Sequence, residues 1–191
     1  GDMRRAAALG GGVTLVTPLL SDEAFDRVEA LARAVPRGAG PLEVVVNDLG
    51  LLRVLRGRAW KNAVVCLGRV LGHRVKVMPP DFAMDFLKEH RVSRVELDDP
   101  ALLPRFEPFG LNVSYHLPFR YISTTRFCPW ELHWPAPCSF SCLGRVRKLE
   151  HPRLPAPLLL RGQAYGLRSA AAPRHPLIDR LVSEPPLKAG R

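Results

Sequence analysis

The 191-residue sequence lacks several features that define common protein classes. No apolar run approaches the roughly 20 residues needed to span a bilayer, so we expect no transmembrane helix and no membrane partner. Four cysteines are too few for a disulfide-rich secreted domain. We therefore expect a cytoplasmic protein whose cysteines are reduced or bind a metal.

Familiar motifs of nucleotide-binding proteins and hydrolases are missing as well. The sequence has no glycine-rich phosphate loop, and Gly10-Gly11-Gly12 precedes an expected strand rather than joining a strand to a helix. No serine lies in a G-x-S-x-G setting, and no H-E-x-x-H pair is present. The residues alone therefore give little support to a protease.

Basic residues exceed acidic ones, with 28 Lys and Arg against 18 Asp and Glu. The resulting net charge of +10 is compatible with a nucleic-acid partner. The basic residues are spread along the chain, however, and the abundance of Arg, Ala, Gly and Pro is typical of a GC-rich genome. RNA therefore stays an alternative partner rather than a conclusion from charge.

Short β-branched or apolar runs alternate with amphipathic segments through much of the chain. The periodicity predicts helices at 21–35, 49–56 and 81–89, and strands at 13–17, 42–46, 62–66, 74–78, 94–97, 111–116, 121–125 and 157–162. Strands alternating with helices favour a parallel sheet with right-handed crossovers. The predicted fold class is α/β, a compact or incomplete TIM-like (β/α) barrel, with an open parallel sheet as the alternative. A complete barrel usually needs about 250 residues.

The predicted domain organisation has three parts. We expect a flexible N-terminus at 1–12, a single barrel-like domain at 13–170, and a Pro-rich C-terminal tail at 171–191. A cysteine loop at 126–147 lies within the domain. A shortened barrel would expose apolar edges, which favours a homodimer.

The cysteine loop is the least random feature of the sequence. Cys128, Cys138 and Cys142 are spaced C-x9-C-x3-C, and prolines at 129, 135 and 137 would stiffen the loop between them. Thiolates are soft ligands that suit zinc and iron–sulfur clusters. We therefore predict a metal or cluster site formed by these three residues.

Three thiolates do not complete such a site. An iron–sulfur cubane normally takes four cysteines, and Cys66 is the fourth candidate because it should lie at the end of a strand. For zinc, His133 or His151 could supply the fourth ligand. The alternative is that all four cysteines are reduced and unliganded, with Cys66 packed in the core.

Three stretches together resemble peptidase family U-32, the collagenase-like family. They are V-V-N-D-L-G at 45–50 with the apolar run that follows, V-C-L-G-R-V-L at 65–71, and the segment 119–128 leading into the cysteine spacing. The resemblance covers roughly residues 40 to 165, and it implies a (β/α) barrel. Some members of the family are called proteases. Others serve oxygen-independent hydroxylation of a ubiquinone precursor or of RNA bases, and these carry a four-cysteine iron–sulfur cluster.

The resemblance implies that Cys128, Cys138 and Cys142 bind a [4Fe-4S] cluster, with Cys66 as the possible fourth ligand. The chain would then assist hydroxylation of an RNA base or a small aromatic quinone precursor. A U-32-type peptidase, which is a hydrolase, is one alternative. A zinc-stabilised RNA-binding or non-catalytic module is the other.

Five further polar residues are candidates for substrate binding. Asn47 and Asp48 follow an expected strand, where chemistry gathers in α/β folds. Asp48 could equally cap a helix. His116 follows an alternating strand, and Arg69 and Arg126 could hold an anionic substrate or simply be solvated.

Overall fold

The computed structural model describes residues 14–20, 22–33, 42–57, 63–125, 127–134, 138–169 and 171–183. The chain forms two compact units. Unit 1 comprises Gly1–Leu97, Ala101–Ser114 and His175–Asp179, and unit 2 comprises Asp98–Pro100, Tyr115–Arg174 and Arg180–Arg191. The predicted flexible terminus at 1–12 and the candidate Arg126 lie outside the described residues.

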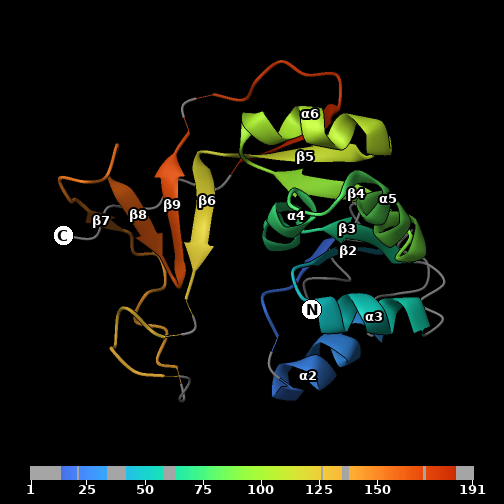
Figure 1. Ribbon diagram of the computed structural model, residues 1–191. Coiled ribbons are helices and arrows are strands. Elements are labelled where there is room, and N and C mark those ends of the chain that lie inside the picture. The colour runs from blue at the N-terminus through green and yellow to red at the C-terminus, as the bar shows by residue number, and fades with distance from the viewer. Residues whose placement is uncertain are drawn as a thin grey trace, which may run out of the picture. The chain divides into compact units, whose positions relative to one another are not determined.

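Unit 1 contains most of a six-stranded sheet, the last two strands of which end in residues of unit 2 (Figure 1). Its neighbouring strands β1 to β4 pair in parallel, as the alternation of strands and helices predicts. The predicted α/β class is therefore confirmed. Among the described strands, β1 and β10 form the two edges of this sheet. The spatial order is β1 (Thr14–Val16), β2 (Leu42–Val46), β3 (Ala63–Leu67), β4 (Val92–Leu97), β5 (Asn112–Leu117) and β10 (Ile178–Ser183).

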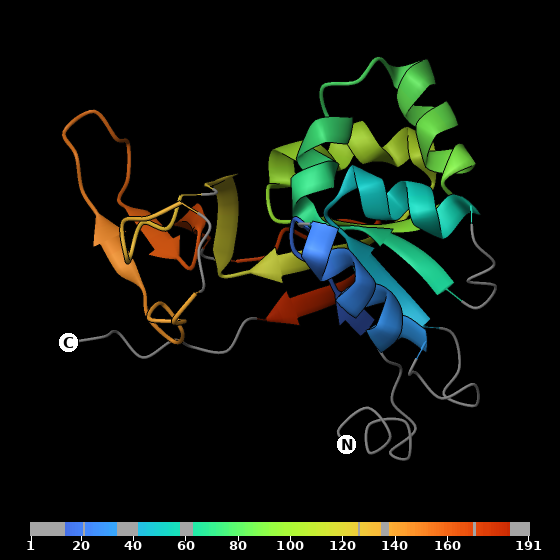
Figure 2. The ribbon, with the colours of Figure 1, turned by 90° about the horizontal axis from the view of Figure 1, so that it is seen from below.

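Helices connect these strands, and α3 to α6 gather over one face of the sheet (Figure 2). The close approach of α4 shows which strand residues point to that face, because a Cβ on Gly72 would lie 3.3 Å from Val95 Cγ2. Leu97 also points there, and both residues are fully buried. The helices are α2 (Asp22–Arg33), α3 (Leu49–Gly57), α4 (Arg69–Val75), α5 (Pro80–Glu89) and α6 (Leu103–Phe106), with 3-10 turns η1 (Pro100–Leu102) and η2 (Glu107–Phe109).

The expected strand at 74–78 is wrong, because helix α4 extends to Val75 and a turn follows it. Leu71 and Val75 lie one helical turn apart, and both are buried. This i, i+4 pair marks the buried side of a short helix. The alternation of Val75 and Val77 imitates a strand, but Val77 is 70% exposed.

Unit 2 contains a four-stranded sheet with antiparallel pairs. Its order is β6 (Phe119–Thr124), β9 (Ala164–Arg168), β8 (Leu158–Arg161) and β7 (Arg147–Leu149). Strands β6 and β9 pack so closely that a Cβ on Gly166 would lie 2.5 Å from Arg120 O. The predicted domain over 13–170 has residues in both compact units.

The predicted Pro-rich tail at 171–191 contains a strand, β10 (Ile178–Ser183). The backbone N–H of Val113 donates to Leu177 O at 3.0 Å, directly before β10. The prolines of this stretch therefore flank a strand.

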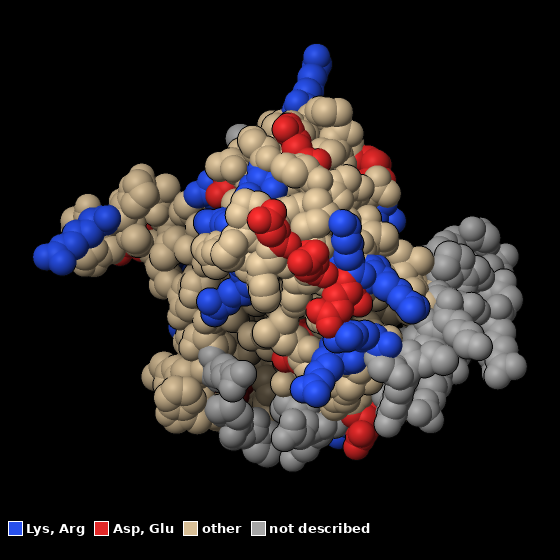
Figure 3. All heavy atoms as spheres, turned by 45° about the vertical axis from the view of Figure 1, so that its right-hand side comes forward, with Lys and Arg blue, Asp and Glu red and all other residues tan. Residues whose placement is uncertain are grey.

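The surface of the molecule carries mixed charge where it can be seen. On the face shown in Figure 3, Lys and Arg side chains are interspersed with Asp and Glu. This agrees with the spread of basic residues along the sequence. Among the described residues, no helix is both long enough and apolar enough to cross a membrane.

Candidate functional site

Three residues with metal-ligating side chains meet in the loop that follows β6. One ligand atom each from Cys128, Glu131 and His133 lies within 4.8 Å of the other two. The backbone creates this proximity, because Cys128 N donates to His133 O at 2.8 Å and Leu132 N donates to Cys128 O at 2.9 Å. The loop therefore turns back on itself and places Cys128 opposite His133 in an isolated bridge.

Both ring nitrogens of His133 contact an oxygen. Nε2 lies 2.8 Å from Glu131 Oε2, and Nδ1 lies 2.6 Å from Trp134 O. The Glu131 carboxylate and the Trp134 carbonyl raise the pKa of His133 above 6.5. A carbonyl on Nδ1 is a common outer partner of metal-bound histidines, because it fixes the ring and directs Nε2 to the metal.

Two serines hold the other side of the Glu131 carboxylate. The Ser139 hydroxyl donates to Glu131 Oε1, and Ser141 bonds the same carboxylate. Together with His133, these bonds hold the pKa of Glu131 at about 2, with Ser139 making the largest contribution. The carboxylate is therefore ionised at neutral pH, as a metal ligand must be.

The serine contacts also locate the other two loop cysteines. Ser139 and Ser141 lie between Cys138 and Cys142, so Glu131 ties this stretch to the turn that carries Cys128. Cys138 is exposed, and its Sγ accepts a hydrogen bond from Phe140 N at 3.3 Å. Cys142 is partly buried. The ligand triad itself takes Cys128 from the predicted cysteine set, but neither Cys138 nor Cys142.

The predicted fourth ligands fall in different places. Cys66 lies within β3 of unit 1, fully buried, with its Sγ 3.8 Å from Leu67 O. Cys128 and the other loop cysteines belong to unit 2. His151 also belongs to unit 2, but it is exposed and its Nδ1 accepts a hydrogen bond from Arg153 N at 3.2 Å. Of the two candidate histidines, only His133 joins the triad.

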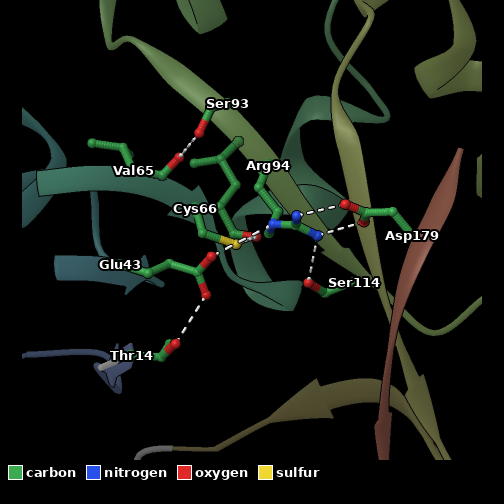
Figure 4. A network of polar contacts seen from close by, with 9 residues as sticks. Thr14, Glu43, Val65, Cys66, Ser93, Arg94, Ser114 and Asp179 are labelled. Atoms are coloured by element: carbon green, nitrogen blue, oxygen red, sulfur yellow. Dashed lines mark hydrogen bonds and ion pairs between the residues drawn. The ribbon is translucent and has the colours of Figure 1, made fainter. Parts of the chain in front are cut away.

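A second polar cluster lies on the sheet strands of unit 1 (Figure 4). Successive side chains of a strand point to opposite faces of the sheet. Since Val95 and Leu97 point toward α4, Arg94 points to the face opposite α4. Its guanidinium binds Asp179 with both ends, at 2.6 and 2.7 Å. It also donates to Ser114 Oγ at 3.2 Å.

The same guanidinium has a second carboxylate beside it. Arg94 Nε lies 3.5 Å from Glu43 Oε2, and Thr14 donates to the other Glu43 oxygen at 3.1 Å. The hydrogen bond with Asp179 makes the largest contribution to raising the pKa of Arg94. Cys66 is the register partner of Arg94 in the parallel β3–β4 pair. This cluster joins side chains from β1, β2, β4, β5 and β10, which indicates a tie across the sheet.

The strand-end candidates Asn47 and Asp48 make structural contacts. Asn47 Nδ2 donates to Thr17 O at 2.8 Å, while its Oδ1 accepts from Val70 N at 3.1 Å. The amide thus joins the ends of β1 and β2 to the start of α4. Asp48 Oδ1 caps α3 by accepting from the N–H groups of residues 50 and 51, at 2.8 and 3.2 Å.

The remaining candidates, Arg69 and His116, are not members of the ligand triad. Arg69 is the first residue of α4 and is partly buried. His116 is buried in β5 and is assigned to unit 2. Neither is a member of the triad among the described residues.

Sequence reasoning missed Glu131 and the partners of Arg94. The spacing C-x2-E-x-H at 128–133 was present as a signal, because three ligand types within six residues can face one ion when a turn brings the ends together. The Arg94–Asp179 pair spans 85 positions, and no local pattern marks it.

Comparison of the chain with models of protein families, with curated proteins and with solved structures gives no match.

Proposed function

We propose that the chain is a zinc-binding protein whose metal is held in unit 2 by Cys128, Glu131 and His133. The observation that carries the proposal is the approach of one sulfur, one oxygen and one nitrogen ligand to within 4.8 Å of one another. Zinc takes this mixture of ligands at about 2.0–2.3 Å. Three protein ligands leave a fourth position for water or for a further side chain.

An iron–sulfur cluster is the second candidate, and the serine contacts of Glu131 favour it. They tie the stretch that carries Cys138 and Cys142 to the turn that carries Cys128. A cubane needs a fourth thiolate. The remaining cysteine, Cys66, is fully buried in β3 of unit 1, so the fourth ligand of such a cluster has no assigned residue in unit 2. Such a cluster supplies electrons, which fits oxygen-independent hydroxylation of an RNA base or a quinone precursor, as the U-32 resemblance implies. Peptidase activity is the other possibility that the same resemblance implies.

The sheet of unit 1 supports a barrel-like interpretation of the fold. Strands β1 to β5 follow one another in space in their sequence order. This order is that of a (β/α) barrel, whereas a doubly wound sheet reverses at a switch point. We propose an incomplete TIM-like barrel with open edges at β1 and β10. A homodimer that covers those edges would sediment as twice the mass of the chain.

Metal analysis of protein purified without oxygen tests the two metal candidates against each other. The zinc proposal predicts about one zinc per chain, no acid-labile sulfide and no visible absorbance. It predicts that Cys128→Ala and His133→Ala each abolish zinc binding. The matched controls Cys142→Ala and His151→Ala retain it.

The cluster candidate predicts the opposite pattern. It predicts iron, sulfide and a brown absorbance, which are lost in Cys142→Ala and kept in His133→Ala. This result would reject the zinc proposal in favour of a cluster. Protein that binds neither metal under these conditions contradicts both candidates.

A further inference from the structure

Two arginines of unit 2 stack on the same indole ring. The guanidinium carbon of Arg147 lies 4.5 Å from the ring centre of Trp130, and that of Arg145 lies 5.3 Å from it. The indole is itself anchored, because its Nε1 donates a hydrogen bond of 2.7 Å to Gly162 O in the turn between β8 and β9. Trp130 therefore acts as a fixed platform for two exposed cations.

In the part of the chain that the structure describes, no carboxylate lies at ion-pair distance from Arg145 or Arg147. Glu131, the acidic residue of the same loop, is held by two serines and His133. The side chain of each arginine donates to one backbone carbonyl, at 3.2 and 3.5 Å, although a guanidinium has five N–H donors. Two like charges with unused donors on one ring form a site that an anion would stabilise.

Large apolar side chains are exposed in the same loop. Leu132, Trp134, Phe140 and Leu143 are between 66% and 80% exposed. The bonds from Glu131 to Ser139 and Ser141 hold their two turns together. Leu132 and Phe140 also have left-handed backbones, with φ of 56° and 58°, a region that bulky residues rarely adopt. The loop thus keeps strained, exposed apolar residues where glycine or asparagine would be more stable in isolation.

We propose that Trp130, Arg145 and Arg147 form a binding site for the phosphate group of an anionic amphiphile, whose apolar part contacts the exposed side chains of the loop. A phosphate offers three oxygens to two guanidinium forks, whereas a single fork uses both oxygens of a carboxylate. The two most exposed of these apolar side chains, Leu132 at 74% and Leu143 at 80%, are aliphatic and favour an acyl or prenyl chain. Trp134 and Phe140 are rings on which a base would stack, so a nucleic acid is the competing ligand that the test must exclude. Trp130, Arg145 and Arg147 lie outside the ligand triad, whereas Glu131 of the triad holds together the turns that carry the apolar side chains.

Calorimetric titration of the full chain in EDTA buffer tests the proposal. The probe is dihexanoyl phosphatidic acid, kept monomeric. Inorganic phosphate, dihexanoyl phosphatidylcholine and oligo(U) RNA serve as comparison ligands. We expect phosphatidic acid to bind more tightly than any of the three. Arg147→Gln should weaken its binding by about tenfold, because charge-assisted hydrogen bonds are lost.

Arg153→Gln is the matched control, since it removes the same charge from an exposed position of unit 2. It should change the affinity by less than about twofold. Arg147→Lys keeps the charge but removes the planar fork, so it should bind several-fold more weakly while leaving the circular dichroism spectrum unchanged. An equal loss in Arg153→Gln and Arg147→Gln would overturn the specific site in favour of general charge.

The comparison ligands decide the chemical class. Equal affinity for inorganic phosphate would reject the amphiphile, because the apolar side chains would then contribute nothing. Tighter binding of oligo(U) would reject it in favour of nucleic acid. Vesicles of phosphatidylglycerol that bind while monomeric phosphatidic acid does not would reject a single-molecule site and indicate a surface contact.

Discussion

Units 1 and 2 are stabilised by different means. Of the buried apolar residues described, only Tyr115, Phe119, Cys128 and Leu160 belong to unit 2, and the others lie in unit 1. Unit 2 relies on strand pairing, on the Trp130 platform and on the bonds of Glu131. The difference teaches that the protein separates a stable apolar scaffold from an exposed loop that carries both ionisable and apolar side chains. Functional residues are often carried on loops that a rigid scaffold supports.

The largest expected effect is on the core of unit 1. Phe106 is fully buried at the end of α6 and contacts the Phe109 ring edge-on at 5.8 Å between centres. Phe106→Ala should lower the free energy of unfolding by about 3–5 kcal/mol, because it leaves a cavity. Urea unfolding followed by circular dichroism measures this loss. A loss below about 1 kcal/mol would show that the apolar scaffold is not the main source of stability.

The next effect concerns the charged cluster on the sheet of unit 1. Arg94→Met leaves Glu43, whose side chain is 13% exposed, without its cation. The free energy of unfolding should fall by about 3 kcal/mol, which is the lower end of the range for breaking a buried ion pair. The lower end is expected because Asp179 is 42% exposed and can be solvated by water. The double variant Arg94→Met with Glu43→Gln should recover part of that loss. No recovery would contradict a direct Arg94–Glu43 interaction.

A smaller effect is expected at the start of α3. Asp48→Ala removes the acceptor for two N–H groups of the first helical turn. The loss should be about 1 kcal/mol in the free energy of unfolding, since the cap is partly exposed. Asp48→Asn is the control and should retain most of the stability. A substrate-binding role would instead appear as reduced ligand affinity with unchanged stability.

The smallest expected change in stability lies in unit 2 and is best seen by titration. Glu131→Gln should return the pKa of His133 toward 6.5, because the carboxylate is the largest cause of the raised value. Proton NMR of the imidazole measures this shift, and Ser139→Ala is a control that keeps the carboxylate. An unchanged His133 titration would contradict the contact between the two residues.

The sign of the pH dependence follows from the same two shifts. The stabilisation from Glu131 is present above pH 4.5 and is lost as the pH falls toward about 2. The stabilisation from His133 is present below pH 6.5 and is lost as the pH rises through the raised pKa. The two groups together should therefore contribute most to the free energy of unfolding between pH 4.5 and 6.5.

Much of unit 1 could be predicted from the sequence. Strand β2 (Leu42–Val46) coincides with its prediction, because an uninterrupted apolar run identifies a strand buried on both faces. The capped start of α3 was equally visible from Asp48. The strand prediction for 74–78 was wrong. Val75 and Val77 have the spacing of two residues that is typical of a strand, but only Val75 is buried.

Unit 2 and the candidate site were less predictable. The three-residue strand β7 (Arg147–Leu149) has no apolar periodicity, and its pairing with β8 defines it. The sequence prediction placed the three loop cysteines in one site because all three offer a sulfur ligand. In the fold, Cys128 instead lies beside a histidine and a glutamate. Glu131 could have been proposed from its position between Cys128 and His133. No local sequence pattern predicts that Ser139 and Ser141 form hydrogen bonds with the Glu131 carboxylate.

The interleaving of the two units has a consequence for synthesis on the ribosome. Unit 1 is complete only when His175–Asp179 is added, after almost all of unit 2 has been translated. During this interval Arg94 cannot bind Asp179, which has not yet been synthesised. Glu43, which precedes Arg94 in the sequence, is already present. A nascent chain stalled before residue 175 would present an unfinished sheet edge at β5, where chaperones bind and where aggregation begins.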